Sequence, residues 1–177
     1  MPVVALIVCG APLARRVGDM AHALVEAGWH TQVVGTPMAI DWVDPAMQSA
    51  LDIRFDFRAP AQQRVRTDID ALIICPATFN TANKIAAGIA DNYAVSLACE
   101  SIGQGLPVVM APMVNNKLWG HFKWESTLAA LTQAGVRLLD IQTGKPGTDP
   151  VESGSGKAVV SRFDPSWLPN ALMHARN

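Results

Sequence analysis

Five short, mainly apolar segments recur along the chain and are separated by longer stretches of mixed polarity. They cover residues 3–9, 31–35, 71–75, 106–110 and 136–139. Continuous apolar runs of this length are typical of strands that are buried on both faces, as in a parallel sheet. Residues 52–57 instead alternate polar and apolar side chains with period two. That alternation predicts a further strand at the edge of the sheet.

The stretches between these segments carry helix signals. Gly28 and Gly135 follow apolar residues at helical spacing, and Asp44-Pro45 combines a capping carboxylate with a proline at the first helical position. Helices are expected over residues 13–27, 45–51, 92–102 and 121–134, with another from the turn 76–80 to residue 88 and a short terminal one from residue 167. Alternating strands and helices predict an α/β fold with a doubly wound, Rossmann-like parallel sheet and flavodoxin-like layering.

The length of 177 residues predicts a single domain spanning residues 1–177. One segment inside it differs in composition. Residues 143–157 contain four glycines, two prolines and almost no large apolar side chain. This composition predicts a mobile loop or flap within the domain.

Charge limits the classes of partner. The chain has 14 basic and 15 acidic residues, without a basic stripe, so we expect no nucleic acid to bind. No stretch approaches the roughly 20 apolar residues that span a bilayer, so we expect no membrane partner. Only 16% of residues are charged. This low value favours surface buried between identical subunits, and an ordinary apolar-rich monomer is the open alternative.

The cysteines indicate a compartment. Cys9, Cys75 and Cys99 have no metal-like spacing, and an odd number argues against a disulfide framework. We therefore expect reduced thiols, no metal site and a cytoplasmic protein.

Candidate chemistry gathers in the loops that follow the predicted strands. In a parallel sheet these loops share the carboxyl edge, where ligands of open α/β sheets bind. They carry hydroxyls and amides at Thr36, Thr78, Thr81, Asn80, Asn115 and Asn116. Such groups, together with free N–H groups at helix starts, could hold a phosphate and a heterocycle. Thr78 could instead be a helix cap. Neither a dinucleotide fingerprint nor a phosphate loop is present, which argues against NAD and ATP.

Two motifs resemble those of the flavin-containing cysteine decarboxylases, which include phosphopantothenoylcysteine decarboxylases and the peptidyl-cysteine decarboxylases of lantibiotic pathways. The family motif Pro-x-Met-Asn-x-x-Met-Trp stands here as Pro112-Met113-Val114-Asn115-Asn116-Lys117-Leu118-Trp119. The second match covers residues 76–81, 84–86 and 88–92, close to the start of the family's flavin-binding helix.

The resemblance implies FMN bound between the subunits of a homo-trimer or a larger assembly of trimers. It assigns the flavin-lining positions to Gly10, Thr36, Thr78, Phe79, Asn80, Thr81 and Met113. Asn115 matches the family's catalytic asparagine, which holds the substrate carboxylate. The implied reaction is oxidation of a cysteine thiolate by the flavin, followed by loss of CO2.

The chain departs from the family at two places. The family's active-site histidine would fall near Gln62, and no histidine lies between His30 and His121. The flap residues 151–157 lack the cysteine of the pantothenate enzymes.

Three functions therefore stay open. The first is a carbon–carbon lyase that oxidatively decarboxylates a small molecule or peptide with a cysteine-like end, at an altered site. The second is an FMN-binding protein or partner subunit that does not decarboxylate. The remote third is a flavin prenyltransferase.

Overall fold

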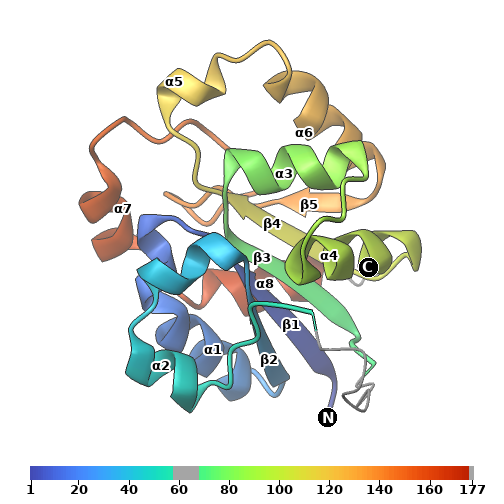
Figure 1. Cartoon of the computed structure of the whole chain (residues 1–177), viewed down its shortest axis with the longest axis vertical. Helices are drawn as coiled ribbons and strands as arrows, with labels where there is room; N and C mark the ends of the chain where they lie inside the picture. Colours follow the sequence, from blue (N-terminus) through green and yellow to red (C-terminus); the bar gives the residue numbers. More distant parts are fainter. Residues whose placement is uncertain (58–67, 176–177) are drawn as a thin grey trace.

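A computed structural model describes residues 1–57 and 68–175. Its centre is one five-stranded sheet in the order β2-β1-β3-β4-β5, and every pair of neighbouring strands is parallel (Figure 1). The strands are β1 (Val3–Val8), β2 (His30–Gly35), β3 (Ala71–Ala77), β4 (Val108–Pro112) and β5 (Val136–Leu138). The predicted doubly wound, flavodoxin-like parallel sheet is confirmed.

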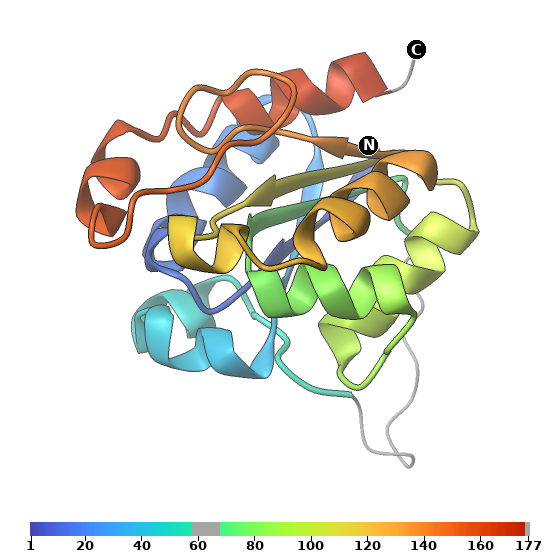
Figure 2. The ribbon, with the colours of Figure 1, turned by 90° about the horizontal axis from the view of Figure 1, so that it is seen from above.

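Helices cover both faces of the sheet (Figure 2). One face packs against α1 (Val17–Glu26) and α8 (Trp167–Ala175), and the other against α3 (Phe79–Ala87), α4 (Tyr93–Gly103) and α6 (Trp124–Gln133). Successive residues of β1 alternate between the two cores, so Leu6 contacts the first layer and Ile7 the second. Burial on both faces explains why this strand reads as an unbroken apolar run.

The remaining elements are short. They are the 3-10 helices η1 (Pro12–Arg16) and η2 (Pro37–Trp42), and the helices α2 (Pro45–Ala50), α5 (Asn116–Trp119) and α7 (Gly156–Arg162).

Side-chain caps set several helix starts. The Asp44 carboxylate accepts the N–H of Ala46 at 2.8 Å, the Thr78 hydroxyl accepts that of Thr81 at 3.3 Å, and the Asn92 amide accepts that of Val95 at 3.1 Å. Each bond satisfies an N–H that has no partner within the helix. The capping interpretation of Thr78 is therefore confirmed.

The predicted edge strand over residues 52–57 is wrong. Arg54 forms a single parallel bridge to Val34, and no other strand pairing occurs there. Asp52 adopts a left-handed φ of 46°, and the Phe55 ring packs so closely over Gly35 that a Cβ there would lie 2.3 Å from it. Ile53 and Phe55 pack against the core while Phe57 is 54% exposed, so the period-two pattern matches burial for only part of the segment. The polar segment that follows falls mainly on residues 58–67, outside the described residues.

Other boundaries shift by a few residues. The predicted helix over 13–27 divides into η1 and α1, and the helix predicted from residue 121 begins at Trp124. The predicted turn at 76–80 is shorter, because β3 continues to Ala77, whose carbonyl accepts the N–H of Met113 at 2.8 Å. The one-turn helix α5 was not predicted.

The predicted flap, residues 143–157, folds back over the ends of β4 and β5, and its last two residues begin α7. Its mobility stays a prediction. The buried Asp140 carboxylate accepts hydrogen bonds from Gln142 N at 3.0 Å, Thr143 Oγ1 at 2.8 Å and Asp149 N at 3.0 Å. This side chain fixes the route of the chain from β5 to the flap.

We expect Asp140→Ala to lower the free energy of unfolding by about 2–4 kcal/mol, because it removes the buried carboxylate that accepts three hydrogen bonds. Chemical denaturation measures the change. Asp41→Ala, which removes an exposed carboxylate from η2, is the control and should change stability little. Equal stability of the two variants would contradict the role of Asp140.

Candidate functional site

Backbone hydrogen bonds join the loops at the carboxyl edge of the sheet. Cys9 N donates to Pro76 O at 3.1 Å, Thr36 N to Val8 O at 2.9 Å, and Met113 N to Ala77 O at 2.8 Å. These bonds link the ends of β1, β2, β3 and β4 side by side. The loops predicted to share an edge do so.

Gly10 and Thr36 lie at the β1 and β2 ends of this edge. A Cβ at Gly10 would lie 2.7 Å from the Met38 carbonyl oxygen, so the glycine allows η2 to approach β1. Thr36 is only 5% exposed, and its backbone is bonded to Val8 and Ala39. Its hydroxyl forms no hydrogen bond with any residue in 1–57 or 68–175. This hydroxyl is therefore available to a ligand.

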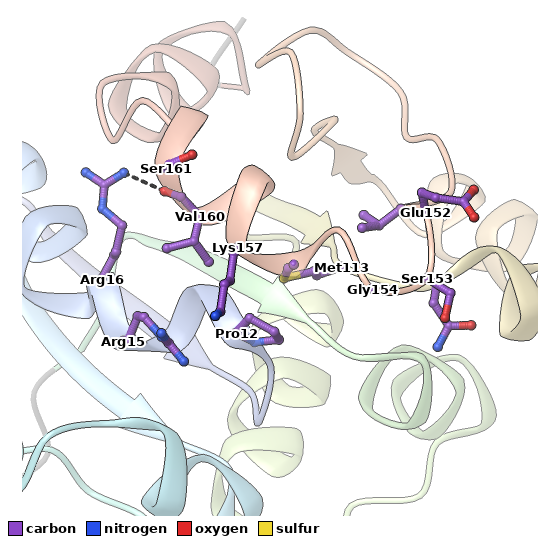
Figure 3. Close-up of a pocket in the computed structure, with 13 residues that line it drawn as sticks. Pro12, Arg15, Arg16, Met113, Glu152, Ser153, Gly154, Lys157, Val160 and Ser161 are labelled. Carbon is purple, nitrogen blue, oxygen red and sulfur yellow. Dashed lines mark hydrogen bonds between the residues drawn. The ribbon is translucent and has the colours of Figure 1, made fainter.

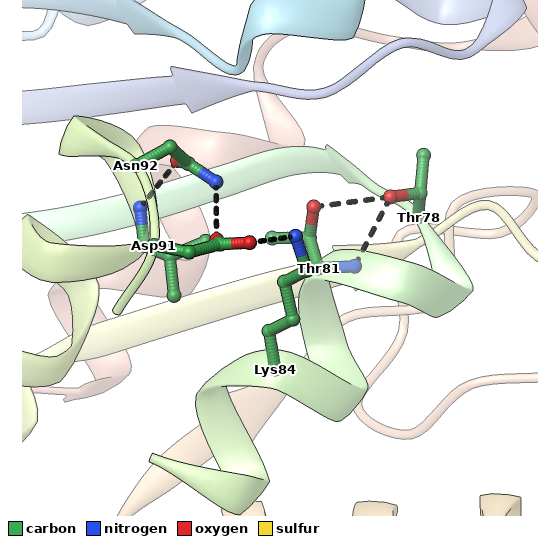
Figure 4. Close-up of polar contacts among 6 residues, drawn as sticks. Thr78, Thr81, Lys84, Asp91 and Asn92 are labelled. Carbon is green, nitrogen blue, oxygen red and sulfur yellow. Dashed lines mark hydrogen bonds and ion pairs between the residues drawn. The ribbon is translucent and has the colours of Figure 1, made fainter. Parts of the chain in front are cut away.

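The start of α3 contributes Thr78, Phe79, Asn80 and Thr81. The Thr78 and Thr81 hydroxyls are bonded to each other at 3.1 Å (Figure 4), whereas the Asn80 amide is exposed and has no partner in the described part of the chain. The Phe79 ring lies 5.2 Å from the Trp124 ring centre and 5.5 Å from that of His121. This helix start thus presents a free amide beside an aromatic group.

The rest of the second motif is structural. Lys84 Nζ pairs with Asp91 Oδ2 at 2.5 Å, and Asn92 Nδ2 donates to Asp91 Oδ1 at 3.0 Å (Figure 4). The Lys84 ammonium, followed by the Asn92 amide, lowers the pKa of Asp91. These contacts join the end of α3 to the start of α4.

The cysteines do not act as thiolates here. Burial raises the pKa of Cys9 and of Cys75, and partial burial raises that of Cys99. All three are free and stay protonated at neutral pH. Within residues 1–57 and 68–175, no three His, Cys, Asp or Glu side chains come close enough together to hold a metal ion.

A pocket of about 820 Å³ opens between η1, the segment after β4, and the flap with α7 (Figure 3). Its lining is Pro12, Arg15, Arg16, Met113, Asn115, Val151, Glu152, Ser153, Gly154, Gly156, Lys157, Val160 and Ser161. Met113 and Asn115 are the two predicted site residues that line it. The predicted flavin positions Gly10, Thr36, Thr78, Phe79, Asn80 and Thr81 lie outside this lining.

The orientation of Asn115 is fixed by its own helix. Its Oδ1 accepts the N–H groups of Lys117 and Leu118, both at 3.0 Å, and so caps α5. Only the carbonyl oxygen of an amide can accept these bonds. The Nδ2 group therefore remains to donate to a ligand in the pocket.

The next residue, Asn116, holds the flap. Its backbone N–H donates to Val151 O at 2.9 Å, its Nδ2 donates to Glu152 Oε2 at 3.0 Å, and its Oδ1 accepts the N–H of Ser153 at 3.2 Å. Val151 N donates in turn to Val114 O at 2.9 Å. Sequence reasoning assigned no role to these contacts, because the partners lie far apart in the chain.

Sequence reasoning also missed the basic residues of the pocket. Arg16 Nε bonds to Asp19 at 2.7 Å, while its NH1 donates to the carbonyls of Val160 at 3.0 Å and Phe163 at 2.7 Å. Arg16 therefore fixes α7 against η1. Arg15 and Lys157 line the pocket beside it. Their only sequence signals are the Arg pair and a lysine in the flap.

Gln62, the predicted counterpart of the family histidine, lies outside the described residues.

Comparison with known proteins finds a matching family model and several related proteins. The Flavoprotein family model matches residues 2–163. A probable phosphopantothenoylcysteine decarboxylase of Streptococcus mutans is 24% identical over 164 residues, which cover 85% of this chain and 88% of that protein. The coenzyme A biosynthesis bifunctional protein CoaBC of Bacillus subtilis is 28% identical over 150 residues, covering 80% of this chain. The chain spans only 36–38% of the length of such bifunctional relatives.

Solved structures agree in fold. A mutant PPC decarboxylase in complex with pantothenoylaminoethenethiol has a TM-score of 0.71 at 20% identity, covering 98% of this chain and 97% of its own. The FMN-dependent cysteine decarboxylase SpaF has a TM-score of 0.70 at 24% identity, covering 100% of this chain and 98% of its own. The family match over residues 2–163, on a five-stranded parallel sheet of this topology, establishes that the chain belongs to the Flavoprotein family.

Proposed function

We propose that this chain binds FMN at the carboxyl edge of the sheet and oxidatively decarboxylates a small molecule or peptide with a cysteine-like end. The observation that carries the proposal is the Asn115 amide. Its oxygen is committed to the α5 cap, its Nδ2 keeps its donors, and the residue lines the pocket, in the motif that resembles the decarboxylases.

The donors at the edge fit a flavin. The Thr36 hydroxyl and the Asn80 amide are neutral groups without partners among the described residues, and such groups suit ring carbonyls and ribityl hydroxyls. Phe79, packed on Trp124, offers an aromatic surface to an apolar ring system. When bound, FMN would supply the electron acceptor for thiol oxidation. AtHal3, whose fold is similar, is described as an FMN binding protein.

Asn115 would hold the substrate carboxylate. A neutral donor can hydrogen-bond a carboxylate without adding a positive charge that would oppose its departure as CO2. Because the α5 cap fixes the amide in advance, little reorganisation is needed when the substrate binds.

A second function is favoured by one observation. The sequence has no histidine between residues 30 and 121 and no cysteine in residues 143–157. FMN binding without decarboxylation is therefore the alternative. The two differ in whether a cysteine-ended compound reduces the bound flavin under anaerobic conditions.

We also infer a homo-oligomer, a trimer or an assembly of trimers. Phe122 is 85% exposed and stacks on His121 at 4.4 Å, and Leu118 is exposed beside them. These side chains surround the Phe79 and Trp119 end of the site, where a second subunit would cover them. One protein of similar fold is described as dodecameric.

We also infer that the protein is located in the cytoplasm. The three free thiols favour the cytoplasm. No helix among residues 1–57 and 68–175 combines the length and apolar character needed to cross a bilayer.

We expect the purified protein to bind FMN and to show flavin absorption. Thr36→Val should weaken the binding about ten-fold, since it removes one hydrogen bond to the cofactor. Titration of the apoprotein with FMN measures this. Thr132→Val, on the exposed side of α6, is the control. A chain that binds no FMN would refute the proposed function.

Asn115→Asp should leave FMN bound and reduce turnover of cysteine-ended compounds at least about 100-fold. The carboxylate can still cap α5, but it loses the donor and repels the substrate carboxylate. Anaerobic flavin bleaching measures the reaction. Gln104→Glu makes the same chemical change on the exposed C-terminal end of α4 and should have no effect. Unchanged turnover in Asn115→Asp would remove the role proposed for Asn115.

Light scattering should give a mass of at least three subunits for the wild-type protein. Phe122→Asp should lower that mass, because a charge would have to be buried between subunits. Val25→Asp changes an exposed apolar residue of α1 and should leave the assembly intact. A wild-type monomer that still binds FMN would contradict the inferred oligomer.

A further inference from the structure

We propose that Trp167, the first residue of α8, is a positioning residue for one wall of the pocket, the stretch from Gly144 to Phe163. Trp167 lies outside the family match, which ends at residue 163, and outside both motifs of the sequence. The inference concerns the shape of the pocket, so it applies to whichever ligand the pocket takes.

The wall is a single stretch of chain. The lining residues from Val151 to Ser161 belong to the flap and to α7, and all of them fall between residues 144 and 163. Figure 3 shows this stretch passing along one side of the pocket, with η1 on the other side. A shift of the stretch relative to η1 would therefore change the width of the pocket.

The beginning of the wall rests on the Trp167 ring. Gly144 has a left-handed φ of 69°, and a Cβ there would overlap the indole, with Cδ2 and Cγ of Trp167 as its nearest atoms. The loop after β5 accordingly lies beside α8 (Figure 2). Only a glycine lets the backbone come so close to the ring, and the ring in turn blocks movement of this backbone toward α8.

The end of the wall rests on the same ring. The centres of the Phe163 and Trp167 rings lie 5.4 Å apart at an interplanar angle of 78°. This edge-to-face arrangement is a favourable one for two aromatic rings. Phe163 is only 3% exposed, and its carbonyl accepts a hydrogen bond from Arg16 at 2.7 Å. The end of α7 is thus held by Arg16 on one side and by Trp167 on the other.

The helix α8 gives the ring a fixed base. Leu168 and Leu172 are fully buried in the core layer that also contains α1. Trp167 N donates to Asp164 O at 3.1 Å, and the Asp164 carboxylate accepts the N–H of Ser166 at 2.9 Å. Because the helix is anchored by its buried leucines, its first residue does not move independently of the core.

Trp167 differs from the polar anchors of the flap in what it joins. Asp140 and Asn116 bond to the flap alone, and Arg16 bonds to α7 and Phe163 alone. The Trp167 ring packs on both ends of the wall at once. We therefore expect its loss to loosen both ends together.

Hydrogen exchange of the purified protein tests this. The reporters are the N–H of Gly147, bonded to Leu138 O, and the N–H of Phe163, bonded to Val159 O, both at 3.0 Å. Trp167→Leu keeps an apolar side chain on α8 but removes the ring, and both reporters should exchange about ten-fold faster. Trp167→Phe restores a ring and should exchange nearly as slowly as the wild type.

The control is a variant that destabilises the opposite core. Leu131, on α6, is 2% exposed and packs on the other face of the sheet. Leu131→Ala should lower global stability at least as much as Trp167→Leu, yet leave the two reporters unchanged, because they exchange by local opening. Equal acceleration of the reporters in both variants, or acceleration of neither reporter in Trp167→Leu, would overturn the proposal.

A double-mutant cycle tests the contact itself. Gly144→Ala forces a Cβ into the ring and should speed exchange at Gly147. The same change in the Trp167→Leu background should add less, because the ring is gone while the left-handed φ is unaltered. Strictly additive effects of the two substitutions would show that the ring does not hold Gly144.

The consequence for the proposed reaction is measured separately. Trp167→Leu should raise KM for cysteine-ended compounds about ten-fold and leave kcat and FMN affinity unchanged, since the wall contains neither Asn115 nor a predicted flavin position. Trp167→Phe should restore KM. Faster exchange with an unchanged KM would overturn the positioning role. Absence of any turnover by the wild-type protein would refute decarboxylation instead, and the exchange data would then decide the present proposal alone.

Discussion

The backbone pairing between Val151 and residues 114–116 is the contact on which the site depends. Val151 N bonds to Val114 O and Asn116 N to Val151 O, both at 2.9 Å. This short parallel pairing brings the flap to the end of β4, and the Asn116 side chain reinforces it through Glu152 and Ser153. Without it, the Asn115 amide would face solvent and the pocket would have no wall on the flap side.

Two further contacts fix the ends of this pairing. The buried Asp140 carboxylate orders the chain between β5 and the flap, and Arg16 holds α7 against η1 on the other side. Both use a charged side chain that accepts or donates several bonds at once, a stronger arrangement than single neutral bonds. The flap is therefore held at its beginning by Asp140 and in its middle by Val151, and Arg16 holds the segment that follows it.

The side chains at the carboxyl edge of the sheet include both neutral and charged groups. Thr36 and Asn80, two of the positions predicted to line a flavin, carry neutral groups, and the amide of Asn115 is neutral as well. The positive charges of the pocket lining belong to Arg15, Arg16 and Lys157. In the proposed decarboxylation, a neutral donor would hold the substrate carboxylate without opposing its departure as CO2.

The sequence by itself determined the fold and most of its helix starts. The continuous apolar runs indicated burial on both faces of a parallel sheet, and the capping residues Asp44 and Thr78 indicated hydrogen bonds to residues no more than three positions away. Both signals are local, and neither depends on distant parts of the chain. The Pro112–Trp119 motif likewise identified the segment that carries Asn115.

Only the tertiary structure decided how the pocket is formed. The pairing of Asn116 with Glu152 joins residues 36 positions apart, and that of Arg16 with Phe163 joins residues 147 apart. Residues 52–57 do not form the predicted strand. Ile53 and Phe55 pack against the core and only Arg54 bridges to Val34, and alternation alone does not distinguish this arrangement from a strand. Side-chain bonds across such separations leave no periodic pattern, because their geometry exists only after the sheet has brought the loops together.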